Sequence, residues 1–467
     1  MKYVSTRGQA PKLDFDDVLL TGLAEDGGLY LPEFWPQISK EKMQDWAKLS
    51  YADLAVEVME PFVHECIDRK TLTELCHKAY GRFRHEAVTP IKQLGSQVWL
   101  QELFQGPTLA FKDCALQMLG LFFEHTLAKK DRAITIIGAT SGDTGSAAIE
   151  ACRDRQGIEI FILFPDGKVS EVQRRQMTTV DSANVHCLAV DGTFDDCQDL
   201  VKACFNDLDF RNKVGLSAVN SINWARIMAQ IVYYFYSALR LGAPEREVQF
   251  AVPTGNFGNV FAGYAAKKMG LPIAKFLVGS NRNDILSRFF NANDMSIRSV
   301  EPSLSPSMDI QISSNFERYL YFVLDEDGQA LAEAMTTFRK DGKLPLSNSA
   351  FTKATEFFEG FSLDDEGTLK EIKRVFEQNQ ELIDPHTAVS TAHADSLDKS
   401  TGIPTIVLAT AHPAKFGEAV KKASGVTPEL PPHLSHIFSI PENYKLLSND
   451  LSMLQALVMS EGAATIS

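Results

Sequence analysis

The sequence predicts an α/β fold with two doubly wound, parallel-sheet domains and a mainly helical N-terminal domain. Three observations lead to this prediction. The chain has 467 residues, of which 45% are hydrophobic and 23% charged, and this is more than one hydrophobic core usually organises. From about residue 132 onward, short apolar runs alternate with segments of helical period, a pattern typical of βαβ units. The residues before position 90 contain helical segments without such runs.

Residues 1–90 are predicted to form the mainly helical N-terminal domain. Residues 46–63 (WAKLSYADLAVEVMEPFV) and 68–83 (DRKTLTELCHKAYGRF) both have helical periodicity. No strand-like run separates them. We therefore expect these two helices to belong to a unit distinct from the sheets that follow.

Six runs rich in β-branched residues are predicted to be strands of parallel sheets. Each run is apolar throughout, and strands of that kind are covered by helices on both faces. The runs span residues 133–139, 157–165, 184–190, 248–253, 273–279 and 404–409. We expect residues 131–245 to form a smaller domain, and residues 91–130 together with 246–467 to form a larger one. The acidic segment 362–367 (SLDDEG), within a less regular stretch from 295 to 378, is predicted to be a solvated loop.

Charge and cysteine content narrow the function classes. A formal net charge of -14 argues against a nucleic-acid or membrane-surface partner, since both attract basic proteins. A small anionic substrate remains possible, because a local pocket can oppose the global sign. The seven cysteines form no C-x-x-C pair and no metal-ligand spacing, which predicts reduced thiols in a cytoplasmic protein. The first residues lack the apolar core of a signal peptide, and no apolar run reaches the length of a membrane helix.

The turns that follow the predicted strands are candidate binding sites, because ligands of open parallel sheets bind beyond the carboxyl ends of strands. The turn after the run 133–139 consists of Thr140, Ser141, Gly142, Asp143, Thr144 and Gly145. Its glycines permit close approach of a ligand, and the amides and hydroxyls at a helix start suit a carboxylate. The alternative is a plain N-cap turn, for which the same residue types are preferred.

A second turn, PTGNFGN from Pro253 to Asn259, follows the run 248–253. Two glycines and two asparagines at a helix start predict a backbone nest for a phosphate. The candidate ligands are Gly255, Asn256, Phe257, Gly258 and Asn259. An ordinary glycine-rich turn is the alternative. The spacing is neither that of a P-loop nor that of a dinucleotide-binding turn, so one phosphate without a nucleotide is the better interpretation.

Thr410 and Lys112 complete the candidate residues. Thr410 ends the run 404–409, where its hydroxyl can meet the ring nitrogen of a cofactor or, alternatively, be satisfied within the core. Lys112 follows Thr108-Leu109-Ala110-Phe111, and apolar surroundings lower the pKa of a lysine towards the range of an amine nucleophile. The alternative for Lys112 is a solvated position at the start of an amphipathic helix. Jointly, the four features are what pyridoxal phosphate acting on an amino acid requires.

Several stretches of the chain resemble the fold-type II pyridoxal-phosphate enzymes, the tryptophan synthase β-like group, and most closely the threonine synthase family in its long form with an N-terminal extension. The resemblance covers nearly the whole chain. It is carried by Thr6–Gly8, Gly27–Pro32, Gly106–Asp113, Gly138–Ala148, Asn220–Ile227, Pro253–Asn259, Asp384–Val389 and Thr410–Phe416.

The resemblance implies roles for these residues. Lys112 would bind pyridoxal 5'-phosphate covalently, residues 255–259 its phosphate, Thr410 its ring nitrogen, and residues 140–145 the substrate carboxylate. The role of Asp143 stays open, because many members of the group carry asparagine there and a carboxylate would repel the phenolate oxygen of the cofactor.

The reaction implied is conversion of O-phospho-L-homoserine and water to L-threonine and phosphate. The phosphate of such a substrate requires cationic or amide donors of its own. The candidates are Lys168, Arg174, Asn220, Asn223 and Arg226. A solvated helix face is the alternative for Arg174.

Three other functions compete with this interpretation. A dehydratase or phospho-lyase that releases a 2-oxo acid has the same cofactor site, so the sequence does not separate it. A binding protein without turnover is disfavoured by the presence of Lys112, and a nucleotide-binding enzyme by the missing phosphate-loop motifs. We expect a small-molecule substrate, no metal, no nucleic acid and no membrane, in a monomer or a homodimer.

Overall fold

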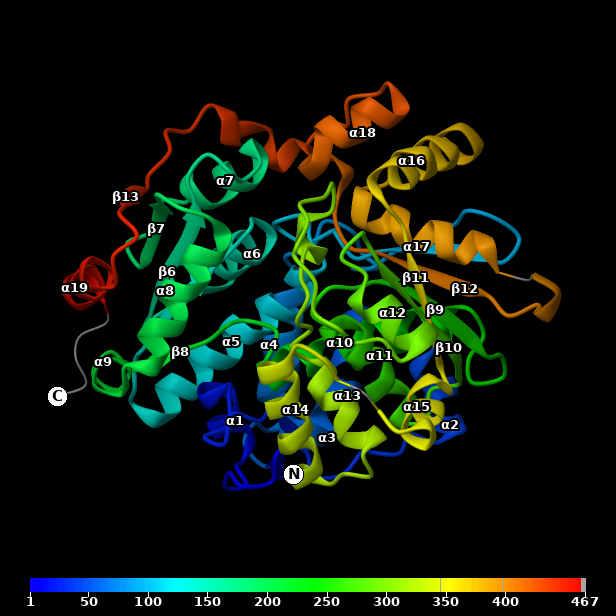
Figure 1. The fold of residues 1–467 in the computed structure, drawn as a ribbon, viewed down its shortest axis with the longest axis horizontal. Helices are drawn as coiled ribbons and strands as arrows, with labels where there is room; N and C mark the ends of the chain where they lie inside the picture. Colours follow the sequence, from blue (N-terminus) through cyan, green and yellow to red (C-terminus); the bar gives the residue numbers. More distant parts are fainter. Residues whose placement is uncertain (345, 398, 463–467) are drawn as a thin grey trace.

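The computed structural model describes residues 1–344, 346–397 and 399–462. Its described residues form two large sheets, each flanked by helices, in two lobes that lie side by side (Figure 1). The predicted α/β class with two parallel-sheet units is therefore confirmed. All six predicted strand runs are strands, with ends that differ from the prediction by one residue at most.

The N-terminal region contains the two predicted helices and a small sheet that was not predicted. Strand β1 (Tyr3–Ser5) pairs antiparallel with β2 (Tyr30–Pro32). The helices of this region are α1 (Phe15–Thr21), α2 (Lys40–Trp46), α3 (Tyr51–Val63) and α4 (Arg69–Tyr80). Helices α3 and α4 begin where Ser50 and Asp68 accept hydrogen bonds from backbone amides of the first turn, and such caps satisfy donors that have no partner inside a helix.

The smaller sheet has the strand order β13-β7-β6-β5-β8, and all of its neighbouring strands are parallel. Its strands are β5 (Ile134–Ala139), β6 (Ile158–Pro165), β7 (Val185–Val190), β8 (Leu216–Ser217) and β13 (Lys445–Leu447). The accompanying helices are α6 (Asp143–Cys152), α7 (Glu171–Thr178), α8 (Phe194–Asn206), α9 (Leu208–Lys213) and α19 (Leu451–Glu461). Strands β5, β6 and β7 are buried over most of their length, which is why they read as continuous apolar runs.

The larger sheet has the order β11-β10-β9-β12-β4-β3, and only β3 is antiparallel to its neighbour. Its strands are β3 (Ile91–Gln93), β4 (Val98–Glu102), β9 (Val248–Pro253), β10 (Ile273–Ser280), β11 (Phe358–Ser362) and β12 (Thr405–Ala409). The helices of this lobe are α5 (Lys112–Lys130), α10 (Trp224–Arg240), α11 (Gly258–Lys268), α12 (Ile285–Ala292), α13 (Phe316–Val323), α14 (Gly328–Asp341), α15 (Asn348–Thr355), α16 (Asp365–Asn379), α17 (Pro385–Ser396) and α18 (Gly417–Ser424). Short 3-10 helices are η1 (Pro306–Met308), η3 (Pro413–Phe416) and η4 (Pro432–Phe438).

The chain crosses between the lobes in two places that differ from the expected division. Strand β13 pairs with β7 of the smaller sheet, although residues 246–467 were expected in the larger domain. In Figure 1 the C-terminal segment runs from α18 across the top of the molecule to β13 and α19. Helix α10, expected in the domain 131–245, packs instead on α3, α5 and α11. Residues 345, 398 and 463–467 of the expected ranges lie outside the described residues.

The acidic segment 362–367 is not a loop. Phe358–Ser362 forms the edge strand β11, and the carboxylate of Asp364 accepts the amide of Gly367 at 2.8 Å as the N-cap of α16. The acidic residues of this segment therefore lie in the first turn of a helix, where negative charge is stabilised by the helix dipole. The prediction of a solvated loop was wrong, because the acidic residues were interpreted as a run of solvated charges and not as the start of a helix.

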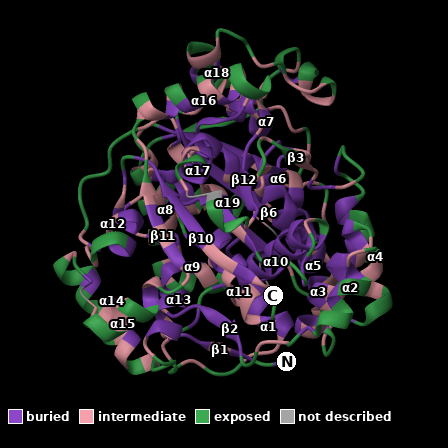
Figure 2. Ribbon diagram, turned by 90° about the vertical axis from the view of Figure 1, so that its right-hand side faces the viewer, coloured by how far each residue is buried: buried purple, intermediate pink, exposed green. Residues whose placement is uncertain are grey.

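The core of the larger lobe is built around α5 and α10. In Figure 2 the strands of both sheets and α10 are mostly buried, whereas α14, α15 and α18 carry exposed surface. Helix α5 packs directly on α6, and the close approach depends on Gly120: a Cβ there would lie 2.2 Å from the carbonyl oxygen of Ala151. Helix α6, which follows β5 of the smaller sheet, is therefore fixed against α5 of the larger lobe.

Replacing Gly120 with alanine is expected to lower the free energy of unfolding. Alanine is the better helix former by about 1 kcal/mol, but the overlap with Ala151 forces the helices apart, and overpacking of this kind costs about 1–3 kcal/mol. Denaturant unfolding followed by circular dichroism measures the effect. Gly95→Ala is the matched control, because a Cβ at Gly95 meets no atom within 4 Å. Equal midpoints for the two variants would contradict the prediction.

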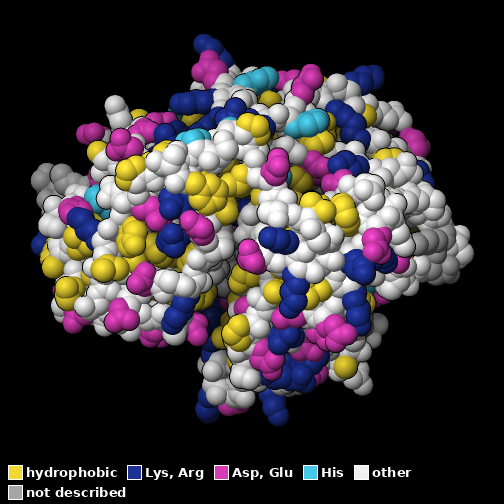
Figure 3. Space-filling model, turned by 90° about the horizontal axis from the view of Figure 1, so that it is seen from above, with side chains coloured by type: hydrophobic (Ala, Val, Ile, Leu, Met, Phe, Trp, Pro, Cys, Tyr) yellow, Lys and Arg dark blue, Asp and Glu magenta, His cyan; other side chains and the backbone are white. Residues whose placement is uncertain are grey.

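The surface shows no segregation of charge on the face seen in Figure 3, where basic and acidic side chains are interspersed. None of the helices in the described part of the chain is long and apolar enough to cross a membrane. All seven cysteines are free thiols, and six of them are buried. Within the described residues no group of histidine, cysteine, aspartate and glutamate side chains is arranged to hold a metal ion.

Candidate active site

A cavity of about 470 Å³ lies at the carboxyl ends of strands from both sheets. The turns after β5 and β9, the residue after β12 and the start of α5 all contribute to its lining. Asn220 and Arg226, before and in α10, line the cavity as well, so the structure brings together most of the predicted residues from five segments of the chain. Those that line the cavity are Lys112, Thr140, Ser141, Asp143, Thr144, Gly145, Asn220, Arg226, Gly255, Asn256, Phe257, Gly258, Asn259 and Thr410.

Lys112 is the first residue of α5 and is buried. Its Nζ lies 3.4 Å from Oδ2 of Asp143. Burial lowers the pKa of the Lys112 amine, and Lys415 and Arg226 lower it further, while Asp143 acts in the opposite direction. The position at a helix N-terminus also disfavours a positive charge. Lys112 is therefore buried, as expected, and does not lie on a solvated helix flank.

The turn before Lys112 is held by Asp113 and contains a strained residue. The Asp113 carboxylate accepts hydrogen bonds from the amide and the hydroxyl of Thr108, at 2.8 and 2.7 Å. Burial raises the pKa of Asp113 to about 6, although the Thr108 hydrogen bonds lower it. Leu109 has a φ of 61°, a conformation that a branched side chain adopts only where surrounding contacts hold it. The Asp113 carboxylate is therefore occupied by Thr108, and the carboxylate that faces Lys112 is that of Asp143.

The turn after β9 forms a cradle at the start of α11. Phe257 adopts a left-handed conformation with a φ of 59°, and a Cβ on Gly255 would lie 2.8 Å from the carbonyl oxygen of Ser307. The backbone of this turn therefore passes close to η1, where a larger residue does not fit. Its outer side is tied down by Asn315, whose amide donates to the carbonyl oxygen of Asn256 at 3.0 Å.

Asn259 presents an unused donor next to this cradle. Its Oδ1 accepts hydrogen bonds from the hydroxyls of Tyr233 and Tyr234, at 2.6 and 2.9 Å. The Tyr234 hydroxyl also lies 2.8 Å from the carbonyl oxygen of Asn259, so the shorter bond from Tyr233 orients the amide. Its Nδ2 is then a donor, and that atom is buried without a partner among the described residues. A buried donor without a partner is costly. The cradle and this donor fit the phosphate group of a cofactor.

The turn after β5 is organised by Thr140. Its hydroxyl accepts the amides of Gly142 and Gly145, at 2.9 and 2.8 Å. Gly142 has a φ of 136°, and a Cβ at this position would lie 2.4 Å from Cδ of Gln173. Those two amides are used within the turn, whereas Ser141 and Thr144 line the cavity at the N-terminus of α6, where a helix can bind an anion.

Thr410 is anchored from two sides. Its carbonyl oxygen accepts the amide of Phe111 at 2.8 Å, and its amide donates to the hydroxyl of Thr387 at 3.3 Å. Thr387 in turn donates to the buried carboxylate of Asp384. The strand end that carries Thr410 is thereby fixed to the segment that carries Lys112.

The five candidates for binding a substrate phosphate divide into two groups. Arg226 is buried beside the cavity, its Nε has no partner among the described residues, and burial lowers its pKa to about 10. Asn220 also lines the cavity. Asn223 instead caps α10 and donates to the carbonyl oxygen of Leu19 at 2.8 Å.

The other two cationic candidates lie away from the cavity lining. Lys168 is exposed and donates to the carbonyl oxygen of Gly192 at 2.9 Å. Arg174 forms a two-pronged ion pair with Glu442, at 2.8 and 3.1 Å. Both follow β6 in the sequence, but neither lines the cavity, so the rule that ligands bind at strand ends did not place them correctly.

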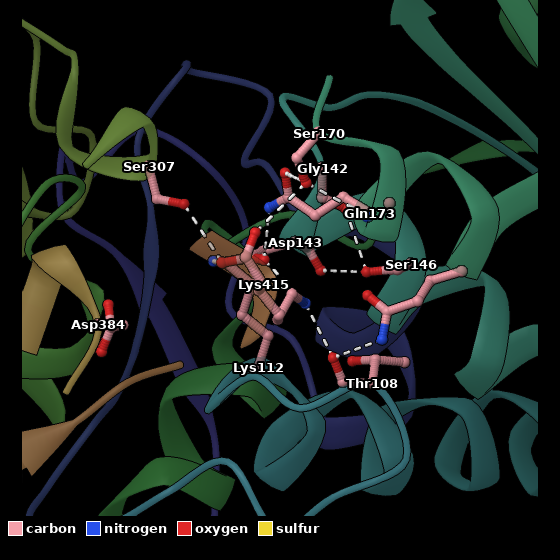
Figure 4. A network of polar contacts seen from close by, with 12 residues as sticks. Thr108, Lys112, Gly142, Asp143, Ser146, Ser170, Gln173, Ser307, Asp384 and Lys415 are labelled. Carbon is pink, nitrogen blue, oxygen red and sulfur yellow. Dashed lines mark hydrogen bonds and ion pairs between the residues drawn. The ribbon is translucent and has the colours of Figure 1, made fainter. Parts of the chain in front are cut away.

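Several polar residues of the site were not predicted. Lys415, Gln173 and Ser307 surround Asp143, as Figure 4 shows. His386 and Ser221 line the cavity. Lys415 carried a signal like that of Lys112, since it lies between the apolar residues Ala414 and Phe416 in the turn that follows the run 404–409. No such signal marks Gln173 or Ser307, which reach the site from a helix face and a 3-10 helix.

Comparison with known families matches the chain along most of its length. The family described as "Threonine synthase N terminus" matches residues 2–80, "Pyridoxal-phosphate dependent enzyme" residues 83–409, and "Threonine synthase, C-terminal" residues 387–458. A threonine synthase of Pseudomonas aeruginosa is 51% identical over 99% of both chains. A threonine synthase of Saccharomyces cerevisiae is 43% identical over 90% of this chain and 88% of its own.

Solved structures give the same result. A pyridoxal-phosphate-bound threonine synthase from Brucella melitensis superposes with a TM-score of 0.97 at 48% identity, covering 99% of this chain and 100% of that one. A threonine synthase from Escherichia coli superposes with a TM-score of 0.82 at 30% identity, over 98% of this chain and 100% of the other.

Proposed function

The chain belongs to the threonine synthase family of pyridoxal-phosphate-dependent enzymes, and from that premise we propose that it converts O-phospho-L-homoserine and water into L-threonine and phosphate. The observation that carries the proposal is a single cavity with two separate places for a phosphate. One is the cradle after β9, and the other is the surroundings of Arg226. A reaction between a phosphorylated cofactor and a phosphorylated substrate requires both.

Pyridoxal 5'-phosphate is the cofactor of this family, and the donors of the cavity fit it. Residues Gly255 to Gly258, at the start of α11, and the free Nδ2 of Asn259 would hold its phosphate. The Thr410 hydroxyl would meet its ring nitrogen. When bound, the cofactor withdraws electrons from the amino-acid substrate and so weakens the bond between Cα and its hydrogen.

Lys112 is proposed to anchor the cofactor and to move the substrate protons. An amine can attach to an aldehyde and can accept a proton only in its unprotonated form. The burial that lowers the pKa of Lys112 favours that form. The same side chain lies within reach of the turn after β5, where the substrate would be held.

The turn after β5 is proposed to bind the substrate carboxylate. Ser141 and Thr144 line the cavity at the N-terminus of α6, where the helix dipole stabilises an anion. Holding the carboxylate there orients the rest of the substrate towards Arg226. The turn thus determines the orientation of the substrate, with its carboxylate at α6 and its phosphate near Arg226.

The substrate phosphate is proposed to bind Arg226, together with Asn220 and Ser221. The Arg226 guanidinium donates from NH1 to the carbonyl oxygen of Val219 at 3.1 Å, which leaves its Nε and the rest of its fork for a ligand. No carboxylate of the described residues pairs with Arg226, so its charge is compensated only when an anion binds.

Purified protein incubated with O-phospho-L-homoserine tests the reaction. We expect L-threonine and phosphate to form in equal amounts. Phosphate accompanied by 2-oxobutyrate in place of threonine would identify the alternative, a pyridoxal-phosphate-dependent phospho-lyase or dehydratase, which the comparisons do not favour. No release of phosphate would overturn the proposal.

We further propose that the protein works in a reducing compartment such as the cytoplasm, which the seven free thiols support.

A further inference from the structure

Asp143 lies at the centre of a polar network that the proposed roles do not explain. In Figure 4 its carboxylate is surrounded by Lys415, Gln173, Lys112 and Ser307. Oδ1 accepts hydrogen bonds from Nζ of Lys415 and Nε2 of Gln173, each at 2.8 Å. Among the residues that the structure describes, Oδ2 has two longer contacts, to Nζ of Lys112 and the hydroxyl of Ser307, each at 3.4 Å.

Lys415 is a wholly buried lysine. Its side chain has an exposed fraction of 0%, and its Nζ contacts Asp143 and the carbonyl oxygen of Thr108, both at 2.8 Å. A buried ammonium is costly unless it is paired and hydrogen-bonded. Lys415 is thus a second buried cation near Lys112. Its partner is the carboxylate of Asp143, which also faces Lys112.

The charges of the two groups are interdependent. Burial alone would raise the pKa of Asp143, but Lys415, Lys112 and His386 hold it well below its usual range. Asp143 is therefore ionised, and Lys415 makes the shorter contact with it. Lys112 receives only the weaker contact, and the pKa of its amine stays lowered by burial.

We propose that Lys415 is a positioning residue: it holds the Asp143 carboxylate through Oδ1 and so keeps Asp143 from forming a close ion pair with Lys112. The inference rests on the proposed function of Lys112. With Lys415 in place, the Lys112 nitrogen loses its proton more easily. The pair also explains how a carboxylate is tolerated at position 143: a carboxylate paired with the buried Lys415 ammonium adds no net charge beside the cofactor.

Other charged groups face this cluster and set the background of its titration. Arg226 of α10 faces Lys112, and His386 of α17 faces Asp143. Asp113, on the same helix as Lys112, faces Lys415. None of these groups is altered in the variants below, so their contributions cancel in the comparison.

The test is the pH titration of the visible absorption of the cofactor-loaded protein, without substrate. Removing the positive charge in Lys415→Met is expected to raise the midpoint by about one to two pH units, because a nearby charge shifts a pKa by that amount. Removing the negative charge in Asp143→Asn is expected to lower the midpoint. The double variant is expected to return to within about 0.5 pH units of the unaltered protein, since it lacks both charges.

Two controls separate charge from structure. Lys415→Arg keeps the cation and is expected to leave the midpoint nearly unchanged. Lys421→Met removes an exposed lysine on α18 and is expected to have no effect, since a distant, solvated charge is screened. Shifts of the same sign in the two single variants, or no shift in either, would overturn the role of Lys415. If Lys415→Met does not fold, the shift in Asp143→Asn alone decides: a midpoint that rises or stays unchanged overturns the role.

The spectrum is read without substrate, so its outcome is independent of the reaction. A protein that shows the opposite shifts but forms no threonine would support the role of Lys415 and refute the proposed function. Threonine formation without the opposite shifts would do the reverse.

Discussion

Lys112→Ala is expected to abolish threonine formation, with a loss on the order of 10⁴-fold or more, because one side chain supplies both the covalent anchor and the proton transfer. Lys112→Arg is expected to be equally inactive, since a guanidinium keeps its charge but does not lose its proton. The measurement is the rate of threonine and phosphate release from O-phospho-L-homoserine.

Borohydride reduction followed by peptide mass spectrometry locates the anchor directly. In the unaltered protein we expect the reduced cofactor on the peptide that contains residue 112, and in Lys112→Ala we expect no label there. Lys415 is the other buried lysine of the described residues and contacts Asp143, which lines the cavity, so it is the internal control. A label on Lys415 in the unaltered protein would contradict the assignment of Lys112.

Arg226→Met is expected to lower kcat/KM for O-phospho-L-homoserine by about 30- to 1000-fold. The figure corresponds to about 2–4 kcal/mol for loss of a buried, charge-assisted contact to the substrate phosphate. Methionine keeps an unbranched apolar stem and removes the charged guanidinium. Most of the loss is expected in KM, since the contact holds a group that is already charged before the reaction begins.

Arg174→Met is the matched control for Arg226. Arg174 is a cation that was also expected to bind the substrate phosphate, but it pairs with Glu442 away from the cavity. Its replacement is expected to leave KM unchanged. Competition by inorganic phosphate provides a second measurement, which should weaken in Arg226→Met only. An unchanged KM in Arg226→Met would remove this residue from the proposed site.

The sequence was sufficient for the strands that carry the site. Strands such as β5 and β9 are covered on both faces, so their apolar runs have sharp ends, and the turns after them could be recognised as binding sites. Strands β3, β4, β8, β11 and β13 of the two large sheets were not predicted. All of them except β4 lie at an edge of their sheet, and each has at most five residues, so each has too few buried residues to form a distinctive pattern.

The site residues divide in the same way. Lys112, Asn259 and Thr410 lie next to strand ends or helix starts, where local sequence determines their position. Gln173 and Lys415 reach Asp143 only because α7 and η3 pack against the turn after β5, and no local pattern contains that contact. Arg174 and Lys168 show the reverse error: they follow a strand in the sequence, but their side chains contact Glu442 and Gly192 and do not line the cavity.

During translation the smaller lobe stays incomplete until the ribosome has made residues 445–461. Until then the outer edge of β7 has no strand to pair with, and the apolar cluster that receives Leu447, Leu454 and Val458 is open to water. An unpaired edge and exposed apolar surface favour aggregation. All strands of the larger sheet precede residue 410, so that sheet can be completed first. The lobe that carries the turn after β5 is therefore completed last on the nascent chain.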